Sequence, residues 1–371
     1  MKKFIFLSAA FYSSFFPLAS NAQSPFSVFA NLFTIPKNYT VTYTKTPPTI
    51  DGDLNDAAWQ QAKWTDDFRD IEGDLKANPQ LQTNVKMLWD DSCLYIAARL
   101  EDPNVWAYIK HHDEVVFRDN DFEVFINPNN TTHQYFELEY NAQNTVFDLL
   151  LNKPYRNGGT PMFSWDAPGM RSVVKVQGTL NNPSDSDKGW TIEIAIPFKA
   201  LSLGNNVQVP AEGSIWRLNF SRVQWDTRAT DGKYIKLRDN AGHNLPEHNW
   251  VWSPQGVVDM HCPERWGYLS FTKSNINNTT FNLPYFEQQK RYLWLVYYHE
   301  QLWYQQHHGY AASLKAFGLG KLVVINKNRN VLSVEATRHQ FMAFIRDKKD
   351  NTTWTINQEG LVRRYNLTSN E

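Results

Sequence analysis

The sequence predicts a mainly β protein, an antiparallel β-sandwich followed by a small C-terminal unit made of one long helix and an antiparallel sheet. Two observations carry this prediction. From residue 83, short runs of β-branched and aromatic residues recur between turn clusters, without long helical patterns between them. From residue 284, one long stretch has helical spacing of its apolar residues, and alternation then returns.

The first 22 residues have the pattern of a secretory signal peptide. Lys2 and Lys3 precede an apolar stretch, and Ala22 ends a run of small residues typical of a cleavage site. The stretch is too short to span a membrane, and no later segment approaches the roughly 18 to 20 unbroken apolar residues that a span needs. We therefore expect a secreted or periplasmic protein without a membrane span.

Composition narrows the class of partner. A formal net charge of −1 gives no electrostatic basis for binding nucleic acid. The aromatic content of 15% includes 14 Trp, which either fill β cores or form platforms on which sugar rings stack. The two cysteines, Cys93 and Cys262, either form one disulfide in an oxidising compartment or remain buried free thiols.

We expect residues 23–45 to form a polar, Pro-containing lead. Residues 47–59 then read as extended chain, a tight Asp-Gly turn and a short helical turn. We expect Asp51 to cap the turn and Trp59 to fill one end of the core. The sandwich strands are then predicted at residues 85–89, 93–100, 122–126, 134–141, 145–151, 173–176, 190–196, 215–222 and 266–271.

The stretch 118–127 concentrates acidic side chains in a strand. Alternation places Asp121 and Glu123 on one face of this strand. The apolar residues Phe122, Val124 and Ile126 lie on the other face. A carboxylate in such a strand is costly to bury unless something pairs with it. The candidate partners are a sugar hydroxyl, a cation, or an arginine such as Arg118 or Arg222.

Composition changes at residues 274–280, a polar Asn-Thr linker. Residues 284–308 then lack internal Gly and Pro and carry Leu293, Val296 and Tyr297 at helical spacing, with Gly309 as the expected stop. Alternation at residues 331–336, 340–346, 353–357 and 361–365 predicts a small sheet that covers this helix. The predicted division is therefore 1–22, 39–273 and 284–371.

Several motifs occur in an order that resembles the family 9 carbohydrate-binding modules, over about residues 39–273. They are Pro-Thr-Ile-Asp-Gly at 48–52 with Trp59, Val-Lys-Met-Leu-Trp-Asp at 85–90 followed by 94–97 and Asp102, Asp-Phe-Glu-Val-Phe-Ile at 121–126, Gly-Trp-Thr-Ile-Glu-Ile-Ala-Ile-Pro at 189–197, and Trp-Gly at 266–267. The C-terminal unit lies outside the resemblance.

The resemblance implies a β-sandwich that binds a sugar between two Trp side chains with polar groups around the ring. Glu123 matches the ligand-contacting Glu of the family. The position of the first Trp falls on Phe117, and Trp106 in the same loop is the candidate to replace it. An Arg that the family places in the next strand falls on Glu137 instead.

The second Trp of the family belongs to the loop before the last sandwich strand, where this chain has Trp250 and Trp252. Because polar residues and Pro flank this Trp-x-Trp pair, we expect it to be hard to bury on both sides. Flat aromatics and carboxylates suit the apolar faces and hydroxyls of a pyranose. The further candidate platforms are Trp165 and Trp225, and the predicted ligand-binding set is Glu123, Trp250, Trp252, Phe117, Trp106, Asp121, Arg222 and Trp225.

Two other functions compete with sugar binding alone. A glycoside hydrolase needs two carboxylates placed across a cleft. The sequence has many carboxylates in this region, but their number does not show that any two face each other across a cleft: Asp119, Asp121, Glu123, Glu137 and Glu139. We expect Glu137 and Glu139 to meet Arg222, Arg99 or a cation. A haem-binding sandwich would draw on Met and His, and Met87, His133, Met162, Met170 and His243 form no local signature.

No cofactor is predicted with certainty, although oxygen-rich turns at residues 51–55 or 127–130 offer ligands for a structural calcium ion. The sequence therefore predicts a secreted, non-catalytic protein that binds poly- or oligosaccharide and supports carbohydrate catabolism. It predicts no nucleic-acid partner and indicates no particular protein partner.

Overall fold

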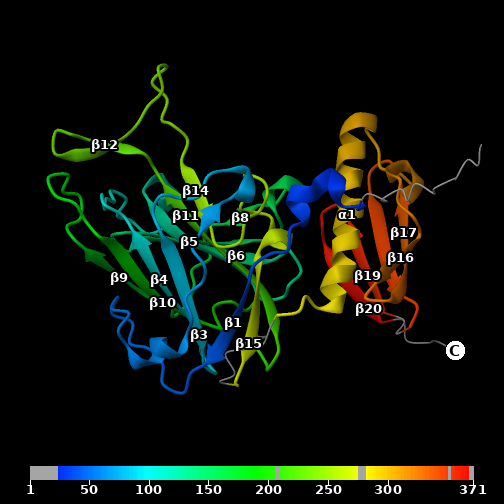
Figure 1. The fold of residues 1–371 in the computed structure, drawn as a ribbon, viewed down its shortest axis with the longest axis horizontal. Coiled ribbons are helices and arrows are strands. Elements are labelled where there is room, and N and C mark those ends of the chain that lie inside the picture. Colours follow the sequence, from blue (N-terminus) through cyan, green and yellow to red (C-terminus); the bar gives the residue numbers. More distant parts are fainter. Residues whose placement is uncertain (1–23, 205–206, 208, 275–280, 350–351, 367–371) are drawn as a thin grey trace, which may run out of the picture.

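The computed structural model describes residues 24–366 apart from 205–206, 208, 275–280 and 350–351, so the predicted signal peptide lies outside the described residues. A large β-sandwich forms one part of the molecule, and a long helix with a small sheet forms the other (Figure 1). The predicted fold class is confirmed. No helix among the described residues is long and apolar enough to cross a membrane.

One large curled sheet builds the sandwich. Its pairings along the main path are antiparallel except for β1, which lies parallel to both of its neighbours. Strand β14 (His248–Val251) adds to β11 and pairs with β2 (Arg69–Asp70). The order is β8 (Pro161–Met162), β7 (Val146–Leu151), β6 (Tyr135–Asn141), β5 (Asp121–Asn127), β11 (Ile215–Gln224), β15 (Gly267–Thr272), β1 (Asn38–Tyr43), β3 (Thr83–Trp89), β4 (Cys93–Glu101), β10 (Gly189–Pro197) and β9 (Arg171–Gln177).

The main hydrophobic core contains residues from both halves of this sheet. Phe122 and Val124 of β5 point into it, as do Met87 of β3, Ile96 of β4 and Ile192 of β10. The alternation predicted for β5 is therefore confirmed, and the other face of β5 points away from this core. Burial of such side chains contributes roughly 1.5 to 3 kcal/mol each to stability.

Short segments connect the strands and close the sandwich. Trp59 in η2 (Ala57–Gln61) is fully buried and its indole donates a 2.6 Å hydrogen bond to Glu193 Oε1. Asp51 Oδ1 accepts from the Asp53 amide and caps the turn, as predicted. The remaining short elements are η3 (Gly73–Leu75), η4 (Val116–Arg118), η5 (Tyr155–Asn157), η6 (Pro263–Arg265), and the hairpin of β12 (Thr227–Thr230) and β13 (Lys233–Lys236).

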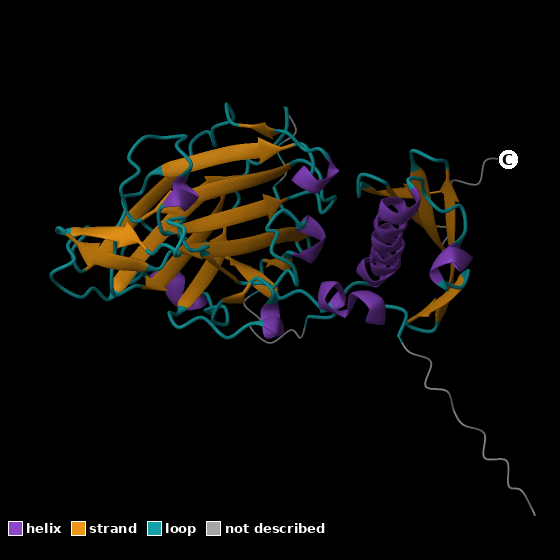
Figure 2. Ribbon diagram, turned by 90° about the horizontal axis from the view of Figure 1, so that it is seen from above, coloured by secondary structure: helices purple, strands orange, loops and turns teal. Residues whose placement is uncertain are grey.

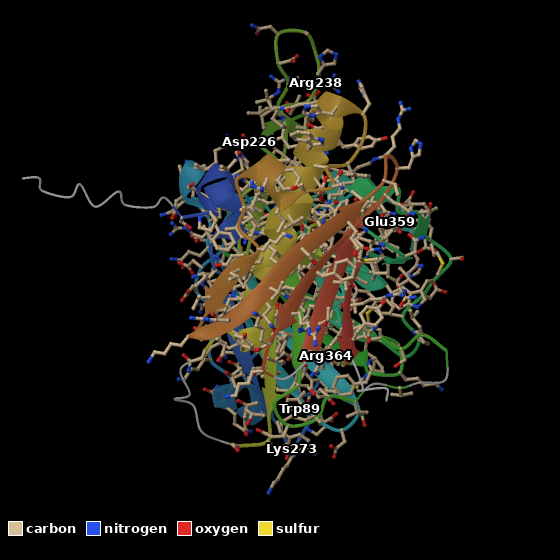
Figure 3. All side chains as sticks on the ribbon, turned by 90° about the vertical axis from the view of Figure 1, so that its right-hand side faces the viewer. Trp89, Asp226, Arg238, Lys273, Glu359 and Arg364 are labelled. Carbon is tan, nitrogen blue, oxygen red and sulfur yellow. The ribbon has the colours of Figure 1, made fainter. Side chains whose placement is uncertain are left out.

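The C-terminal helix α1 (Tyr285–His307) lies between the sandwich and the small sheet (Figures 1 and 2). It ends at His307, two residues before the expected stop at Gly309, because His308, with φ 54°, adopts the left-handed conformation and its amide bonds to the Tyr304 carbonyl. The antiparallel sheet has the order β16 (Leu322–Ile325), β17 (Asn328–Ala336), β18 (Phe341–Asp347), β19 (Thr352–Asn357), β20 (Val362–Asn366), and η7 (Leu314–Phe317) precedes it. Figure 3 shows this sheet in front of α1.

The segment before β1 was expected to be a polar lead, and the structure corrects this. It forms η1 (Ser27–Phe33), which packs on α1. Phe26 lies 5.1 Å from Tyr292 between ring centroids, and Phe33 lies 5.9 Å from Tyr298. The hydrophobic cluster of the C-terminal unit therefore includes residues from the N-terminal end of the described chain.

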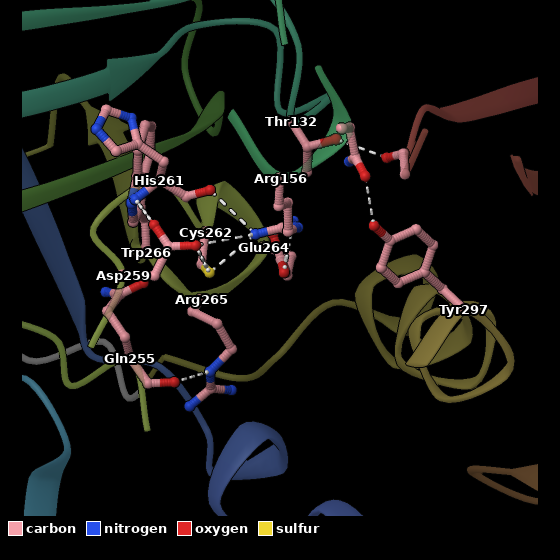
Figure 4. A network of polar contacts seen from close by, with 12 residues as sticks. Thr132, Arg156, Gln255, Asp259, His261, Cys262, Glu264, Arg265, Trp266 and Tyr297 are labelled. Atoms are coloured by element: carbon pink, nitrogen blue, oxygen red, sulfur yellow. Dashed lines mark hydrogen bonds and ion pairs between the residues drawn. The ribbon is translucent and has the colours of Figure 1, made fainter. Parts of the chain in front are cut away.

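A buried polar network joins α1 to the sandwich. Glu287 of α1 accepts from Arg217 of β11 and from Lys290, each at 2.8 Å. Burial alone raises the pKa of Glu287, but Lys290 and Arg217 outweigh it and lower this pKa to about 2. In a second group of contacts, shown in Figure 4, the Tyr297 hydroxyl of α1 donates to Asn157 Oδ1 at 2.7 Å, and the neighbouring Arg156 forms two hydrogen bonds with Glu264.

Both cysteines are free thiols. Cys262 is buried and accepts a hydrogen bond from Arg156 at 2.8 Å, whereas Cys93 is half-buried at the start of β4. Of the two alternatives for the cysteines, a disulfide or free thiols, the structure therefore contains the free thiols.

Candidate functional site

A cavity of about 430 Å³ opens on the face of β5, β6 and β7 that points away from the main core. Glu123, Glu137 and Glu139 lie along it, and segments around residues 155–163, 247–249 and 258–261 surround it. A larger hollow of about 910 Å³ lies beside η1, but its carboxylates, such as Asp66 and Asp74, are well exposed. The smaller cavity is the candidate site because it combines buried charge with exposed aromatic side chains.

The floor of the cavity is a group of buried carboxylates. The register of β5 on β6 places Glu123 directly opposite Glu139, and all three glutamates are buried. Glu139 Oε2 accepts from the Phe117 amide at 2.9 Å. Asp121 lies on the same face of β5 two residues earlier, and its Oδ1 accepts from the Val223 amide at 3.1 Å.

Burial has the largest influence on the pKa values of the carboxylates in this floor. It raises the pKa of Glu123 to about 7. Burial, together with the nearby charge of Glu123, also raises the pKa values of Glu137, Glu139 and Asp121 well above their usual range. None of the Lys and Arg ion pairs among the described residues involves these four carboxylates.

His261 is the one imidazole beside the floor among the residues that line the cavity. Its Nε2 lies 3.9 Å from Glu137 Oε2, and its Nδ1 lies 2.9 Å from the Tyr135 hydroxyl. Burial lowers the pKa of His261 to about 4. The imidazole is therefore neutral near pH 7 and supplies no positive charge beside the carboxylates.

Three aromatic side chains are exposed along the cavity. Phe117 is 38% exposed, Tyr155 43% and Phe163 53%. Phe163 stacks on Phe147 of β7 with ring centroids 5.8 Å apart, and Tyr155 meets the His261 ring edge-on at 4.5 Å. These contacts position Phe163 and Tyr155, while part of the surface of all three rings stays exposed.

The predicted pairing of these carboxylates with Arg222 is wrong. Strand β11 places Ser221 opposite Glu123, so Arg222 points to the other face of the sheet. There its guanidinium donates to Gln224, to Thr83 and to the Glu101 carbonyl, and lies 3.6 Å from Asp102. The other proposed arginines lie elsewhere: Arg118 is exposed in η4, and Arg99 stacks on Trp64 and bonds to Asn84.

The expectation that Trp250 and Trp252 are exposed is also wrong. They are 7% and 2% exposed and belong to the main core. Residues 248–251 form β14 rather than a loop, which aligns Trp250 with Arg222. Trp252 covers Gly267 so closely that a Cβ there would lie 2.3 Å from the indole ring.

The other tryptophan side chains predicted as platforms are also buried or half-buried. Trp106 is buried against Tyr108, and Trp165 packs on Phe136 with ring centroids 4.7 Å apart. Trp225 is half-buried; its indole donates to the Phe117 carbonyl, and Lys236 Nζ lies 3.3 Å from its ring centre. Of the predicted set, only Glu123 and Phe117 line the cavity, with Asp121 directly behind.

The sequence interpretation did not single out Tyr155, Phe163, Glu247, Asn249 or His261 as site residues. Tyr155 and Phe163 flank the Gly158-Gly159 turn. Large apolar side chains in a glycine-containing loop without strand alternation are a signal that could have found these two. Nothing local marks the other three, because they reach the cavity only through the pairing of β14 and the fold around η6.

The turns proposed for calcium use their oxygens internally. Asp53 pairs with Lys175 at 2.8 Å, and Asn127 Oδ1 accepts from the Asn129 amide. Calcium at these turns stays a prediction. The Met and His side chains considered for haem are spread over the fold, with Met87 in the main core and His243 exposed beside Asp239.

A comparison with protein-family models decides the family. The model of the carbohydrate family 9 binding domain-like family matches residues 50–267. The chain belongs to this family. The match confirms the resemblance read from the sequence, and it spans the strands from β2 into the start of β15 while leaving out the C-terminal unit.

Solved structures of family 9 modules resemble the chain. A family 9 module from Caldicellulosiruptor kristjanssonii, in complex with cellotriose, shares 16% identity at a TM-score of 0.40 over 67% of this chain and 100% of that chain. A Bacteroides uniformis protein whose structure is named for carbohydrate binding shares 16% at a TM-score of 0.46 over 64% and 99%. A search of curated proteins gives no match.

Proposed function

We propose that this family 9 protein is secreted, binds poly- or oligosaccharide in the cavity over β5, β6 and β7, and does not cleave it. Its role would be to hold carbohydrate for a catabolic process carried out by other proteins. The signal-peptide pattern of residues 1–22 supports secretion, and the family supports carbohydrate as the ligand class.

The observation that carries the proposal is the combination of Glu123 and Glu139 with exposed rings at one cavity. A pyranose presents apolar C–H faces and a rim of hydroxyls. Phe163 and Tyr155 offer flat apolar area for the faces. The carboxylates accept hydrogen bonds from the hydroxyls, and charge-assisted bonds of this kind are stronger than neutral ones.

The arrangement favours binding over hydrolysis. Retaining glycosidases separate their two carboxyl groups by about 5 to 5.5 Å and inverting enzymes by about 6.5 to 9.5 Å. Asp121, Glu123 and Glu139 each offer an oxygen within 4.8 Å of the others. They are packed side by side on one sheet face and do not flank a bond from two sides.

The test is calorimetric titration of the mature protein with neutral plant and microbial polysaccharide fragments, chosen from a glycan array. We expect micromolar to millimolar affinity, about −4 to −8 kcal/mol. Glu123→Gln keeps the shape and removes the charge, so binding should weaken by about tenfold to a hundredfold, from the roughly 1.5 to 3 kcal/mol of a charged hydrogen bond.

Glu193→Gln is the matched control, because Glu193 is a buried strand carboxylate in a different half of the sandwich. It should leave the affinity for sugar unchanged. Equal affinities of the wild type and Glu123→Gln would place the sugar elsewhere. Release of reducing sugar by the pure wild type would contradict the non-catalytic part of the proposal.

A further inference from the structure

Asp121 lies close to Glu123 and Glu139, two of the buried carboxylates that line the cavity. One oxygen from each of Asp121, Glu123 and Glu139 lies within 4.8 Å of the others, and all three residues are buried. Glu123 and Glu139 are also direct cross-strand neighbours. Like charges placed directly opposite on neighbouring strands destabilise a sheet.

An independent observation concerns Asp121 Oδ2. Asp121 is 0% exposed, and this oxygen has no hydrogen-bond partner. The other oxygen, Oδ1, is held by the Val223 amide, which fixes the direction of the carboxylate. A buried carboxylate oxygen without a partner is costly. It therefore needs a ligand that donates or carries positive charge.

The protein supplies no cation at this position among the described residues. Arg222 lies on the opposite face of β11, where Asp102 and neutral acceptors surround it. Lys236 Nζ lies over the Trp225 ring at 3.3 Å. His261 is near Glu137 rather than within the group of three carboxylates.

We propose that Asp121, Glu123 and Glu139 bind a divalent cation with the ligand preferences of Ca²⁺. Such an ion would compensate the charge of the three carboxylates and give Asp121 Oδ2 its partner. The proposal deepens the proposed function and partly rests on it, because Glu123 and Glu139 also line the cavity assigned to the sugar.

The chemistry of the donors selects the ion. Calcium takes six to eight oxygen ligands in flexible geometry, whereas Zn²⁺ and later transition metals favour nitrogen and sulfur. The group contains only carboxylates. Because three carboxylates leave coordination positions unfilled, the side of the ion toward the cavity would be open to water or to sugar hydroxyls.

A second acidic group, His112, Asp113, Asp148 and Asp166, is a weaker candidate. His112, Asp113 and Asp166 are exposed, and His112 already lies 3.1 Å from both Asp113 and Asp148. The carboxylates of this second group therefore interact with solvent and with His112. This contrast makes Asp148→Asn a useful comparison variant.

The experiment is a titration of the EDTA-treated and dialysed mature protein with CaCl₂ by calorimetry, without sugar. Tb³⁺ luminescence excited through the nearby aromatic rings gives a second readout. We expect one calcium equivalent with a dissociation constant of about 10⁻⁵ to 10⁻³ M. Asp121→Asn and Glu139→Gln should each weaken it at least tenfold, and Asp148→Asn should leave this equivalent unchanged.

Wild-type protein that binds no Ca²⁺ and gives no Tb³⁺ signal would overturn the proposal, whatever the variants do. So would folded Asp121→Asn and Glu139→Gln variants with wild-type stoichiometry and affinity. Sugar titrations in EDTA and in excess CaCl₂ separate the two proposals. Calcium binding without any sugar binding would refute only the proposed function, and sugar binding with no ion binding would refute only the cation.

Discussion

At the residue scale, two aromatic side chains of the sandwich have different surroundings. Trp252 is almost completely buried in the main core, whereas Phe163 is more than half exposed on the rim of the cavity. Trp252→Ala should therefore lower the free energy of unfolding by about 3 to 5 kcal/mol through the cavity it leaves. Chemical denaturation measures this loss.

Phe163→Ala is the complementary change. It should weaken sugar binding by about twofold to tenfold, from roughly 0.5 to 1.5 kcal/mol of ring contact, while changing the free energy of unfolding far less than Trp252→Ala does. If Trp252→Ala instead preserved stability and abolished sugar binding, the indole would have to reach the ligand. The burial of Trp252 in the structure would then not describe the protein in solution.

Glu123 and Trp252 show what the sequence can predict about a site. Alternation placed Glu123 on the correct face of β5, because the period of a strand is local and Phe122 and Val124 mark its buried side. Burial of Trp252 was not predictable from its polar neighbours. It depends on Gly267, which lies in another strand and leaves room for the indole.

At the element scale, α1 carries an acid whose charge the fold does not compensate. Glu300 is fully buried; its Oε2 accepts from the Ala311 amide, but its Oε1 has no partner. Burial raises the pKa of Glu300 to about 7. Because this pKa lies above that of the unfolded chain, its contribution to stability is fully present below about pH 4.5 and is lost as the pH rises through 7.

Glu300→Gln should remove that loss. Relative to the wild type, the variant should be more stable at pH 8, by up to about 3 kcal/mol, and the advantage should shrink toward zero at about pH 4.5, the usual Glu value. Thermal melts of both proteins at the two pH values measure the difference.

The matched control is Glu335→Gln in β17, because the side chain of Glu335 is exposed to water. Removing an exposed carboxylate should change the melting temperature little at either pH. An equal advantage of Glu300→Gln at both pH values would mean that the charge of Glu300 is not the cause.

Strands and helices differ in how well the sequence predicted them. The long strands with clear alternation, such as β4 and β10, and helix α1 were predicted within a few residues. Short strands were missed, and β14 was read as a loop. A four-residue strand has too few positions to show alternation, and its pairing with β11 fixes it instead.

At the scale of the whole molecule, the start of the described chain packs on helix α1 of the C-terminal unit. Arg291 of α1 donates to the Phe33 carbonyl, and the Phe29 ring lies 4.9 Å from that of His299. These contacts join residues more than 250 positions apart. Neither periodicity nor composition can reveal such a contact, which explains why the sequence predicted only a polar lead for this segment.

This contact determines how the molecule should respond to truncation. The sandwich has its own cores, whereas η1 belongs to the cluster of the C-terminal unit. A truncated protein of residues 36–273 should therefore stay soluble and keep a β-type circular dichroism spectrum. Residues 24–273 should aggregate more readily, because Phe29 and Phe33 lose the helix that covers them.

Size-exclusion chromatography with light scattering compares the two truncated proteins with the mature chain. The loss of α1 also removes Glu287 from Arg217, but truncation exposes that guanidinium to water, which solvates it and limits the cost. Aggregation of residues 36–273 to the same extent as 24–273 would show that the sandwich needs α1 as a cover. In that case the buried pair of Arg217 and Glu287 would mark a single cooperative unit rather than a docking contact between two folding units.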